Sequence, residues 1–357
     1  MGSAATEVTS DGNAYRRIHR SRIRASLSNL GLAPIISESR GRSGRPSRCR
    51  STRNRPSFYF QPIGPTDMND KVIVPILAIL AALAIAAGMA WAGSQGGVTV
   101  SGWPVLALAG AFAFIVQWIV FVPSYRAQTE HYYDLTGSLT YLAVAIGTLL
   151  LAGAYDARSI LLVGLVSIWA LRLGSFLFLR VRQAGRDDRF DTIKPSFARF
   201  LMAWTLQGLW IFLTLAAALA AITSSKTVPL GLVGLLGIGI WIVGFATEAI
   251  SDNQKRRFRR DPANAGRFIT TGLWAWSRHP NYFGEITLWV GIALIALPAL
   301  SGWQYLTLLS PAFVFLLLTR VSGIPLLEAK AEERWGDDPT FRAYKARTPA
   351  LFPRRPS

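Results

Sequence analysis

The chain has 357 residues, of which 51% are hydrophobic and only 16% are charged, yet its formal net charge is +18. Several stretches of about 20 residues carry almost no charge, which is long enough to cross about 30 Å of hydrocarbon. This composition excludes an ordinary soluble domain and favours a polytopic membrane protein. The single cysteine, Cys49, excludes an intramolecular disulfide and argues against a cysteine-ligated zinc site, so we expect no metal.

The first segment, residues 1–67, is rich in Arg, Ser, Gly and Pro and holds twelve arginines against four acidic residues. It has too little apolar surface to offset the entropy lost on ordering, so we expect it to be disordered. It fits an organelle transit peptide or an Arg-rich tail attracted to anionic lipid. It also fits a mis-assigned start, which we favour because Met68 stands directly before the first apolar run.

From residue 72 onward, the apolar runs predict an all-α, polytopic membrane helix bundle. We expect eight spans, at about 72–92, 103–123, 135–154, 159–179, 198–222, 228–250, 281–300 and 303–325. Lys and Arg concentrate between the fourth and fifth spans and between the sixth and seventh, which predicts that both termini lie in the cytoplasm. Loop charge of this kind also explains the positive excess, so nucleic acid is not an expected partner, whereas membrane lipids are. We expect a bacterial inner membrane, and an organelle remains open if the first segment is genuine.

The most polar stretch runs from Ser251 to Glu285 and separates two apolar runs. It holds seven cations, namely Lys255, Arg256, Arg257, Arg259, Arg260, Arg267 and Arg278. The planar guanidinium of Arg binds two phosphate oxygens at once, and Trp274 and Trp276 can stack on a nucleotide. The stretch therefore predicts a site for a cofactor with a diphosphate. The alternative is that the cations only set the membrane orientation.

Two pairs of polar side chains flank this stretch at helical spacing. Glu248 and Asp252 are four residues apart, as are Asn281 and Glu285, so each pair shares one face of a helix. Carboxylates inside a span are costly unless they are paired or hydrated, which makes each a functional candidate. The alternative is that each carboxylate pairs with an arginine of the same loop and only holds the helices in place.

A second polar cluster occupies residues 125–141, between the second and third spans. Glu130 or Tyr133 could donate a proton or polarise a carbonyl at the mouth of the bundle, so we take both as candidate catalytic residues. An interfacial belt of aromatic residues with a few solvated charges explains the same residues equally well.

Three motifs together resemble one superfamily, the membrane steroid 5-alpha-reductases and the related sterol reductases. They are DNQKRRFRRDP (252–262), GLWAWSRHPNYFGE (272–285) and LLEAKAEERWGDDPTFRAYKARTP (326–349), and the similarity covers roughly residues 245–353. The resemblance implies a membrane enzyme that uses NADPH to reduce an activated C=C bond in a lipid-like substrate, such as a steroid, a sterol or an enoyl lipid. It also implies that residues 68–250 form the substrate side and residues 251–357 the cofactor side.

Carried over by position, the resemblance implies cofactor-binding roles for twelve residues. They are Asp252, Lys255, Arg256, Arg259, Arg267, Trp274, Trp276, Asn281, Tyr282, Glu285, Glu328 and Tyr344. The chain departs from the family at two positions, because Glu248 stands where the steroid reductases have Asn and Gly266 where they have Tyr. Glu130 and Tyr133 are only analogues of the acid and the tyrosine that hold a steroid carbonyl.

The RHPNYFG element at residues 278–284 is also similar to the isoprenylcysteine carboxyl methyltransferases, which use S-adenosylmethionine. We favour the reductase because seven cations suit the phosphates of NADPH better than a methyl donor that has no phosphate. A membrane scaffold that keeps the fold without the chemistry is a third interpretation. The oligomeric state is not indicated by the sequence.

Overall fold

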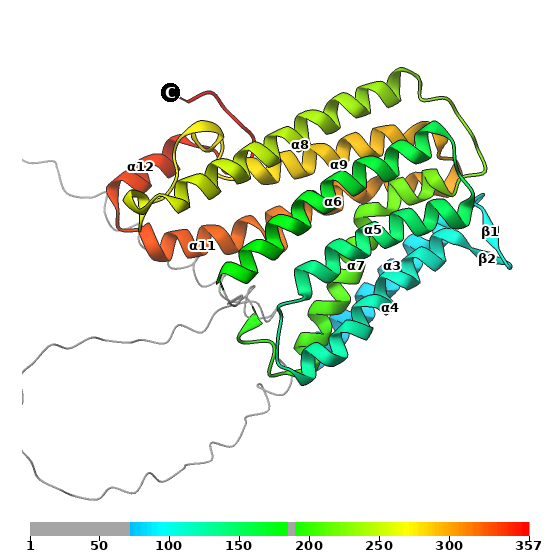
Figure 1. Ribbon diagram of the computed structural model, residues 1–357, viewed down its shortest axis with the longest axis horizontal. Helices are drawn as coiled ribbons and strands as arrows, with labels where there is room; N and C mark the ends of the chain where they lie inside the picture. Colours follow the sequence, from blue (N-terminus) through cyan, green and yellow to red (C-terminus); the bar gives the residue numbers. More distant parts are fainter. Residues whose placement is uncertain (1–71, 185–189, 357) are drawn as a thin grey trace, which may run out of the picture.

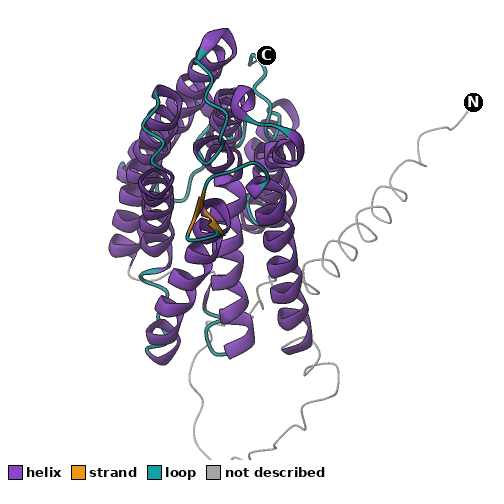
Figure 2. Cartoon of the chain, turned by 90° about the vertical axis from the view of Figure 1, so that its right-hand side faces the viewer, coloured by secondary structure: helices purple, strands orange, loops and turns teal. Residues whose placement is uncertain are grey.

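The computed structural model describes residues 72–184 and 190–356, and in this part of the chain long helices run side by side in a bundle (Figure 1). Figure 2 shows that the described chain is almost entirely helix, apart from one short hairpin. The long helices are α3 (Val74–Ser94), α4 (Val105–Arg126), α5 (Tyr133–Ala152), α6 (Ala157–Ala184), α7 (Phe197–Ile222), α8 (Gly231–Arg260) and α9 (Pro280–Ala296). The hairpin pairs β1 (Thr99–Val100) with β2 (Trp103–Pro104) in antiparallel register.

Shorter helical elements complete the chain. Single 3-10 turns span Pro262–Asn264, Gly272–Ala275 and Leu297–Ala299. The last span is composite, because a 3-10 segment (Gly302–Leu309), α10 (Ser310–Leu316) and a π-helical turn (Leu317–Val321) follow one another. The charged tail forms α11 (Ile324–Trp335) and α12 (Pro339–Arg347).

Eight helical segments among the described residues are long and apolar enough to cross a membrane. This confirms the predicted all-α membrane bundle. For most of the helices, the observed first and last residues lie within a few residues of the expected span. The main exception is the sixth, which we expected to end at residue 250 but which continues as α8 to Arg260. Its last ten residues contain no Gly or Pro and are rich in Lys, Arg and Gln, which favour helix. Pro262 follows directly and cannot continue the hydrogen-bonding pattern. The disorder expected for residues 1–67 lies outside the described residues.

Helix α7 forms the centre of the bundle. It is apolar on every side, and nearly all of its residues from Leu209 to Ile222 are buried. A helix without a polar face is stable only where other helices or lipid surround it. Here α3, α4, α5, α9 and α10 pack around α7 and provide that environment.

Helices α8 and α9 approach each other closely through glycines. A Cβ atom added to Gly237 would lie 2.8 Å from the carbonyl oxygen of Gly291, and one added to Gly284 would lie 2.6 Å from that of Gly244. Small residues at a crossing let two backbones come together, as is common between membrane helices. The crossing brings the last turns of α8 next to the first turns of α9, where the predicted polar pairs lie.

Replacing Gly284 by valine should therefore separate α8 from α9. The added side chain would meet backbone atoms of Gly244 and Glu248, which cannot rotate away, so we expect a loss of about 1–3 kcal/mol in the free energy of unfolding. The measurement is thermal unfolding of the purified protein in detergent. Gly239→Val is the matched control because a Cβ at Gly239 meets nothing within 4 Å. Equal melting temperatures for the two variants would contradict the close crossing.

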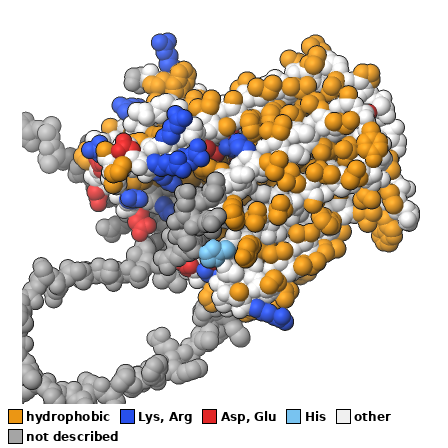
Figure 3. All heavy atoms as spheres, viewed as in Figure 1, with side chains coloured by type: hydrophobic (Ala, Val, Ile, Leu, Met, Phe, Trp, Pro, Cys, Tyr) orange, Lys and Arg blue, Asp and Glu red, His pale blue; other side chains and the backbone are white. Residues whose placement is uncertain are grey.

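Charge is unevenly distributed along the bundle. On the face shown in Figure 3, the Lys and Arg side chains gather mainly at the end that carries the C-terminal part of α8 with α11 and α12, while most of the remaining surface is hydrophobic. At the opposite end, exposed tryptophans occur in the last turn of α3, in the hairpin and at the start of the last span, namely Trp91, Trp103 and Trp303. Aromatic side chains of this kind favour a membrane–water interface. That the charged end faces the cytoplasm remains a prediction.

Candidate functional site

A buried cluster of charged side chains lies where α6, α8 and α9 meet. The guanidinium of Arg172, on α6, donates to Glu248 and to Asp252, the latter over 3.1 Å from Nη1 to Oδ2. Glu285, on α9, is only 8% exposed and interacts electrostatically with both Arg172 and Asp252. Two carboxylates thus share the guanidinium of Arg172, and a third lies within its electrostatic range. We call Arg172, Glu248, Asp252 and Glu285 the ion cluster.

The pairing differs from the simple alternative in the sequence analysis. Glu248 and Asp252 do lie on one face of α8, as their spacing predicted, but their arginine comes from a different span and not from the neighbouring loop. Glu248 is 2% exposed and also accepts a hydrogen bond of 3.2 Å from the indole N–H of Trp169. Three helices are therefore joined by polar contacts at this level of the bundle.

Three aromatic side chains connect the ion cluster to the apolar core. Trp169 packs edge-to-face against both Tyr141 and Trp289, with ring centroids 5.0 Å apart in each pair. The hydroxyl of Tyr141 lies beside Thr214 and within electrostatic range of Glu285. Within the described part of the chain, neither this hydroxyl nor the indole N–H of Trp289 has a hydrogen-bond partner of ordinary geometry. A buried donor without a partner calls for an explanation, such as a catalytic role or a bound water molecule.

Asn281 stands at the edge of the ion cluster, in the first turn of α9. Pro280 begins this helix, as suits a residue without a backbone N–H. The Asn281 side chain bonds to Asp252, and its Oδ1 has no partner among the described residues. An unpaired amide oxygen can accept an N–H from a ligand.

The turn before α9 is held by the tail. Glu328, on α11, accepts from Arg278 Nε at 3.0 Å and lies 2.9 Å from His279 Nε2. Burial lowers the pKa of His279, so this imidazole is neutral at neutral pH. The ring of Tyr282 stacks on the imidazole of His279, with the ring centroids 5.7 Å apart. Glu328 and Tyr282 thus contribute to the architecture of the site, and their direct contact with a cofactor remains a prediction.

Trp274 joins α8 to the tail. Its indole N–H donates to the carbonyl oxygen of Ser251 over 3.0 Å, and Lys255 Nζ lies 4.3 Å from its ring centroid. The hydroxyl of Tyr344, on α12, donates to the carbonyl oxygen of Trp274 over 2.7 Å. Burial raises the pKa of Tyr344 to about 12, so this donor stays protonated.

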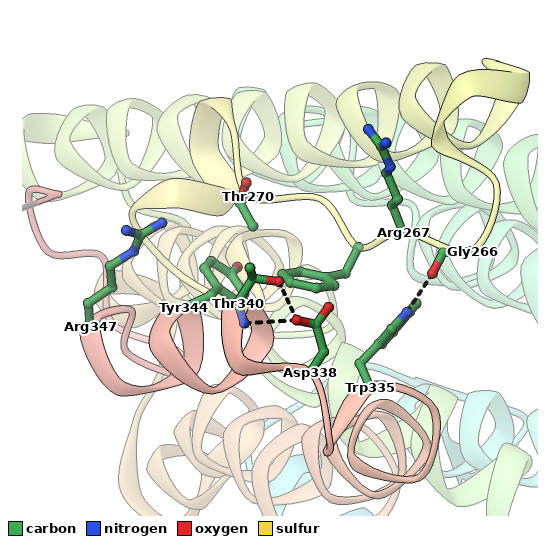
Figure 4. A pocket seen from close by; sticks show the side chains of 9 residues that line it. Gly266, Arg267, Thr270, Trp335, Asp338, Thr340, Tyr344 and Arg347 are labelled. Carbon is green, nitrogen blue, oxygen red and sulfur yellow. Dashed lines mark hydrogen bonds between the residues drawn. The ribbon is translucent and has the colours of Figure 1, made fainter.

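A pocket of about 340 Å³ opens between the 266–270 segment and the tail (Figure 4). It is lined by Gly266, Arg267, Phe268, Thr270, Trp335, Asp338, Thr340, Tyr344 and Arg347. The structure therefore brings two of the predicted cofactor residues, Arg267 and Tyr344, to one cavity. We call it the tail pocket.

Other predicted residues lie outside both sites. Arg256 is exposed and donates to Asn253 Oδ1 over 3.0 Å, and Arg259 is exposed near the end of α8. Trp276 is 44% exposed, and its carbonyl oxygen accepts from the backbone N–H of Arg354. These three belong neither to the ion cluster nor to the lining of the tail pocket, and their roles remain predictions.

The predicted catalytic pair lies in a separate part of the bundle. Glu130 is 3% exposed and lies 2.5 Å from the ammonium group of Lys194. The hydroxyl of Tyr133 donates to the carbonyl oxygen of Ala203 over 2.9 Å, and its ring packs on Phe190. This packing belongs to a small cluster that also contains Phe121, Phe200 and Trp204, distinct from the core with Tyr141 and Trp289. A catalytic role for Glu130 or Tyr133 remains a prediction.

Sequence reasoning missed two residues of the site. Arg172 carried a usable signal, since a cation within an apolar run is costly and calls for a buried partner. Tyr141 carried almost none, because a tyrosine near the end of a span is equally typical of an interface. Only the packing of α5 against α6 and α9 distinguishes the two cases.

Comparison with known proteins agrees with the three motifs. A family model described as "Protein of unknown function (DUF1295)" matches residues 120–348, which is more than half of the chain. An uncharacterised protein of Schizosaccharomyces pombe, C594.04c, is 24% identical over 228 residues, covering 55% of this chain and 64% of the relative. A 3-oxo-5-alpha-steroid 4-dehydrogenase 1 of Macaca fascicularis is 31% identical over 123 residues, which cover 33% of this chain and 41% of the relative. A delta(14)-sterol reductase of Ascobolus immersus is 30% identical over 138 residues, which cover 32% of this chain and 29% of the relative.

The chain spans less than two thirds of the length of each of these relatives. No solved structure matches it. The family match and the two reductases confirm the superfamily that the motifs predicted. The chain belongs to the family of proteins of unknown function DUF1295, within the superfamily of the steroid 5-alpha-reductases and sterol reductases.

Proposed function

We propose that the protein is a membrane-embedded reductase that transfers a hydride from NADPH to an activated C=C bond of a lipid-like substrate. The observation that carries this proposal is the ion cluster with Tyr141 and Asn281 beside it, at the junction of α6, α8 and α9. The names of the steroid dehydrogenase and the sterol reductase support the same reaction class. A location in a bacterial inner membrane remains an expectation.

The residues of the site fit a phosphorylated nicotinamide cofactor. Asn281 Oδ1 is available to accept an N–H of a carboxamide, and Glu285 lies one turn further along α9. Lys255, which lies over the ring of Trp274, and Arg267, which lines the tail pocket, supply positive charge for phosphates. The cofactor would bring the hydride, and the protein would position it and exclude water.

Reduction of a C=C bond by a hydride also requires a proton on the neighbouring carbon. We assign its delivery to Tyr141, because its buried hydroxyl has no hydrogen-bond partner of ordinary geometry among the described residues and lies within electrostatic range of Glu285. The hydroxyl of Tyr133, in contrast, is occupied by a backbone carbonyl. Tyr133 and Glu130 remain competing assignments, which a paired substitution can separate.

The helices from α3 to α7 would receive the substrate. A lipid-like molecule is the expected class because the surface around these helices is apolar and would face the bilayer. Steroid, sterol, enoyl lipid and isoprenoid all satisfy this requirement. A screen of enones from these classes would identify the substrate.

The proposal is tested by titrating NADPH and S-adenosylmethionine separately into the full chain in detergent while following thermal unfolding. A ligand that binds only the folded state at 100 times its Kd stabilises it by about 2.7 kcal/mol. We expect NADPH to raise the melting temperature and S-adenosylmethionine to leave it unchanged. Glu285→Gln should abolish the shift, whereas Trp303→Phe, which changes an exposed side chain at the opposite end of the bundle, should keep it.

The other outcomes contradict the proposal in different ways. A shift with S-adenosylmethionine alone would replace the reductase by a methyltransferase, as the RHPNYFG element would allow. No shift with either ligand, in protein whose helical circular dichroism is intact, would contradict both activities and leave the scaffold interpretation.

A further inference from the structure

We propose that the tail pocket binds the phosphorylated adenosine end of the dinucleotide and that Arg347 contacts its 2′-phosphate. This inference rests on the proposed function and extends it, because Arg347 then makes the protein prefer NADPH to NADH. Arg347 lies within the third motif, at residues 326–349, but the resemblance implied no role for it. A role emerges only because α12 folds back against the 266–270 segment.

The walls of the pocket offer flat aromatic surfaces. Phe268 packs against Trp335 at 5.6 Å and against Tyr344 at 5.7 Å between ring centroids. The indole N–H of Trp335 donates to the carbonyl oxygen of Gly266 over 2.6 Å, and the hydroxyl of Tyr344 donates to the carbonyl oxygen of Trp274. These hydrogen bonds fix the orientation of both rings. Rings held in this way are pre-organised to pack against a heterocyclic base.

The charge of the lining favours an anion. Arg267 and Arg347 stand at opposite ends of the pocket in Figure 4, and Asp338 lies between them. Neither arginine side chain donates a hydrogen bond within the described part of the chain, whereas Arg278 and Arg342 are both occupied by carboxylate and carbonyl oxygens. The two guanidinium groups are therefore available to a ligand with two separated phosphate groups.

Asp338 does not oppose this role. Its carboxylate caps α12, accepting from the backbone N–H of Thr340 over 2.8 Å and from its hydroxyl over 2.6 Å. With two arginines against one aspartate, the lining keeps a net positive charge. A cavity of about 340 Å³ also falls within the usual size range of small-molecule sites, roughly 300–1,000 Å³. Size, charge and aromatic walls together point to a phosphorylated nucleoside.

The test compares Arg347→Ala with the parent in the full chain, using isothermal titration with NADPH, NADH and adenosine 2′,5′-bisphosphate. Loss of a charge-assisted contact should weaken the binding of NADPH and the bisphosphate by about 10- to 100-fold. The affinity for NADH, which has no 2′-phosphate, should stay within about twofold of the parent value because it cannot make that contact. Arg355→Ala is the matched control, since it removes an exposed cation from the same terminal segment but does not line the pocket.

Each alternative outcome overturns a distinct statement. Equal NADPH affinities for Arg347→Ala and the parent would overturn the role of Arg347 and leave the reductase in place. An equal loss in Arg355→Ala would overturn it too, because the effect would then be general electrostatic attraction. Binding of the bisphosphate without binding of NADPH would keep the nucleotide pocket and refute the reductase.

Discussion

Replacing Arg172 by alanine should lower the free energy of unfolding by about 3–5 kcal/mol, because breaking a buried ion pair leaves charge without compensation. Arg172 is the cation that both Glu248 and Asp252 contact, and Glu285 lies within its electrostatic range. Its guanidinium also lies over the ring of Phe245, 5.5 Å from the centroid. The loss should appear as a lower melting temperature and as aggregation during size-exclusion chromatography.

Two further variants show whether charge is the cause. Arg256→Ala removes an exposed cation from α8 and should change stability by less than about 0.5 kcal/mol. Adding Glu248→Gln to Arg172→Ala should restore part of the loss, because one of the unpaired carboxylates is then neutral. If Arg172→Ala and Arg256→Ala had the same melting temperature, the ion cluster would not contribute to the stability of the bundle.

Replacing Tyr141 by phenylalanine should lower turnover about 100-fold, since positioned general acids typically contribute factors of 10²–10⁴. The substitution removes one oxygen atom and keeps the ring that packs between Trp169 and Trp289. Binding of NADPH and the KM of the substrate should change little. The measurement is steady-state consumption of NADPH with the enone that a substrate screen selects.

Tyr133→Phe is the matched partner of this experiment. It also removes a single hydroxyl from α5, but one that donates to the backbone of Ala203. We expect it to lower stability slightly and to retain most of the turnover. The reverse result, with Tyr133→Phe inactive and Tyr141→Phe active, would identify Tyr133 as the proton donor, as the sequence analysis suggested.

Much of the fold followed from local composition. Runs of about 20 apolar residues locate the spans because the hydrocarbon core demands that length and satisfies no backbone hydrogen bond. Helix α11 lies between Gly323 and Gly336 and is rich in residues with strong helix preference. The expected end of α8 was wrong because hydropathy reports where the membrane ends, whereas the helix continues to Arg260, two residues before Pro262.

Local patterns in the sequence suffice to predict the membrane bundle, the superfamily and the shared helix faces of Glu248 with Asp252 and of Asn281 with Glu285. Those features depend on periodicity and on residue order, which are local. The packing of the helices selects the span that supplies the arginine to the ion cluster, and it brings Tyr141 within electrostatic range of Glu285 while the hydroxyl of Tyr133 donates to a backbone carbonyl. It also brought Arg267 and Arg347 to one pocket. Such contacts join residues far apart in the chain, and they depend on which helices pack together and at which crossing points, here those that the glycines of α8 and α9 permit.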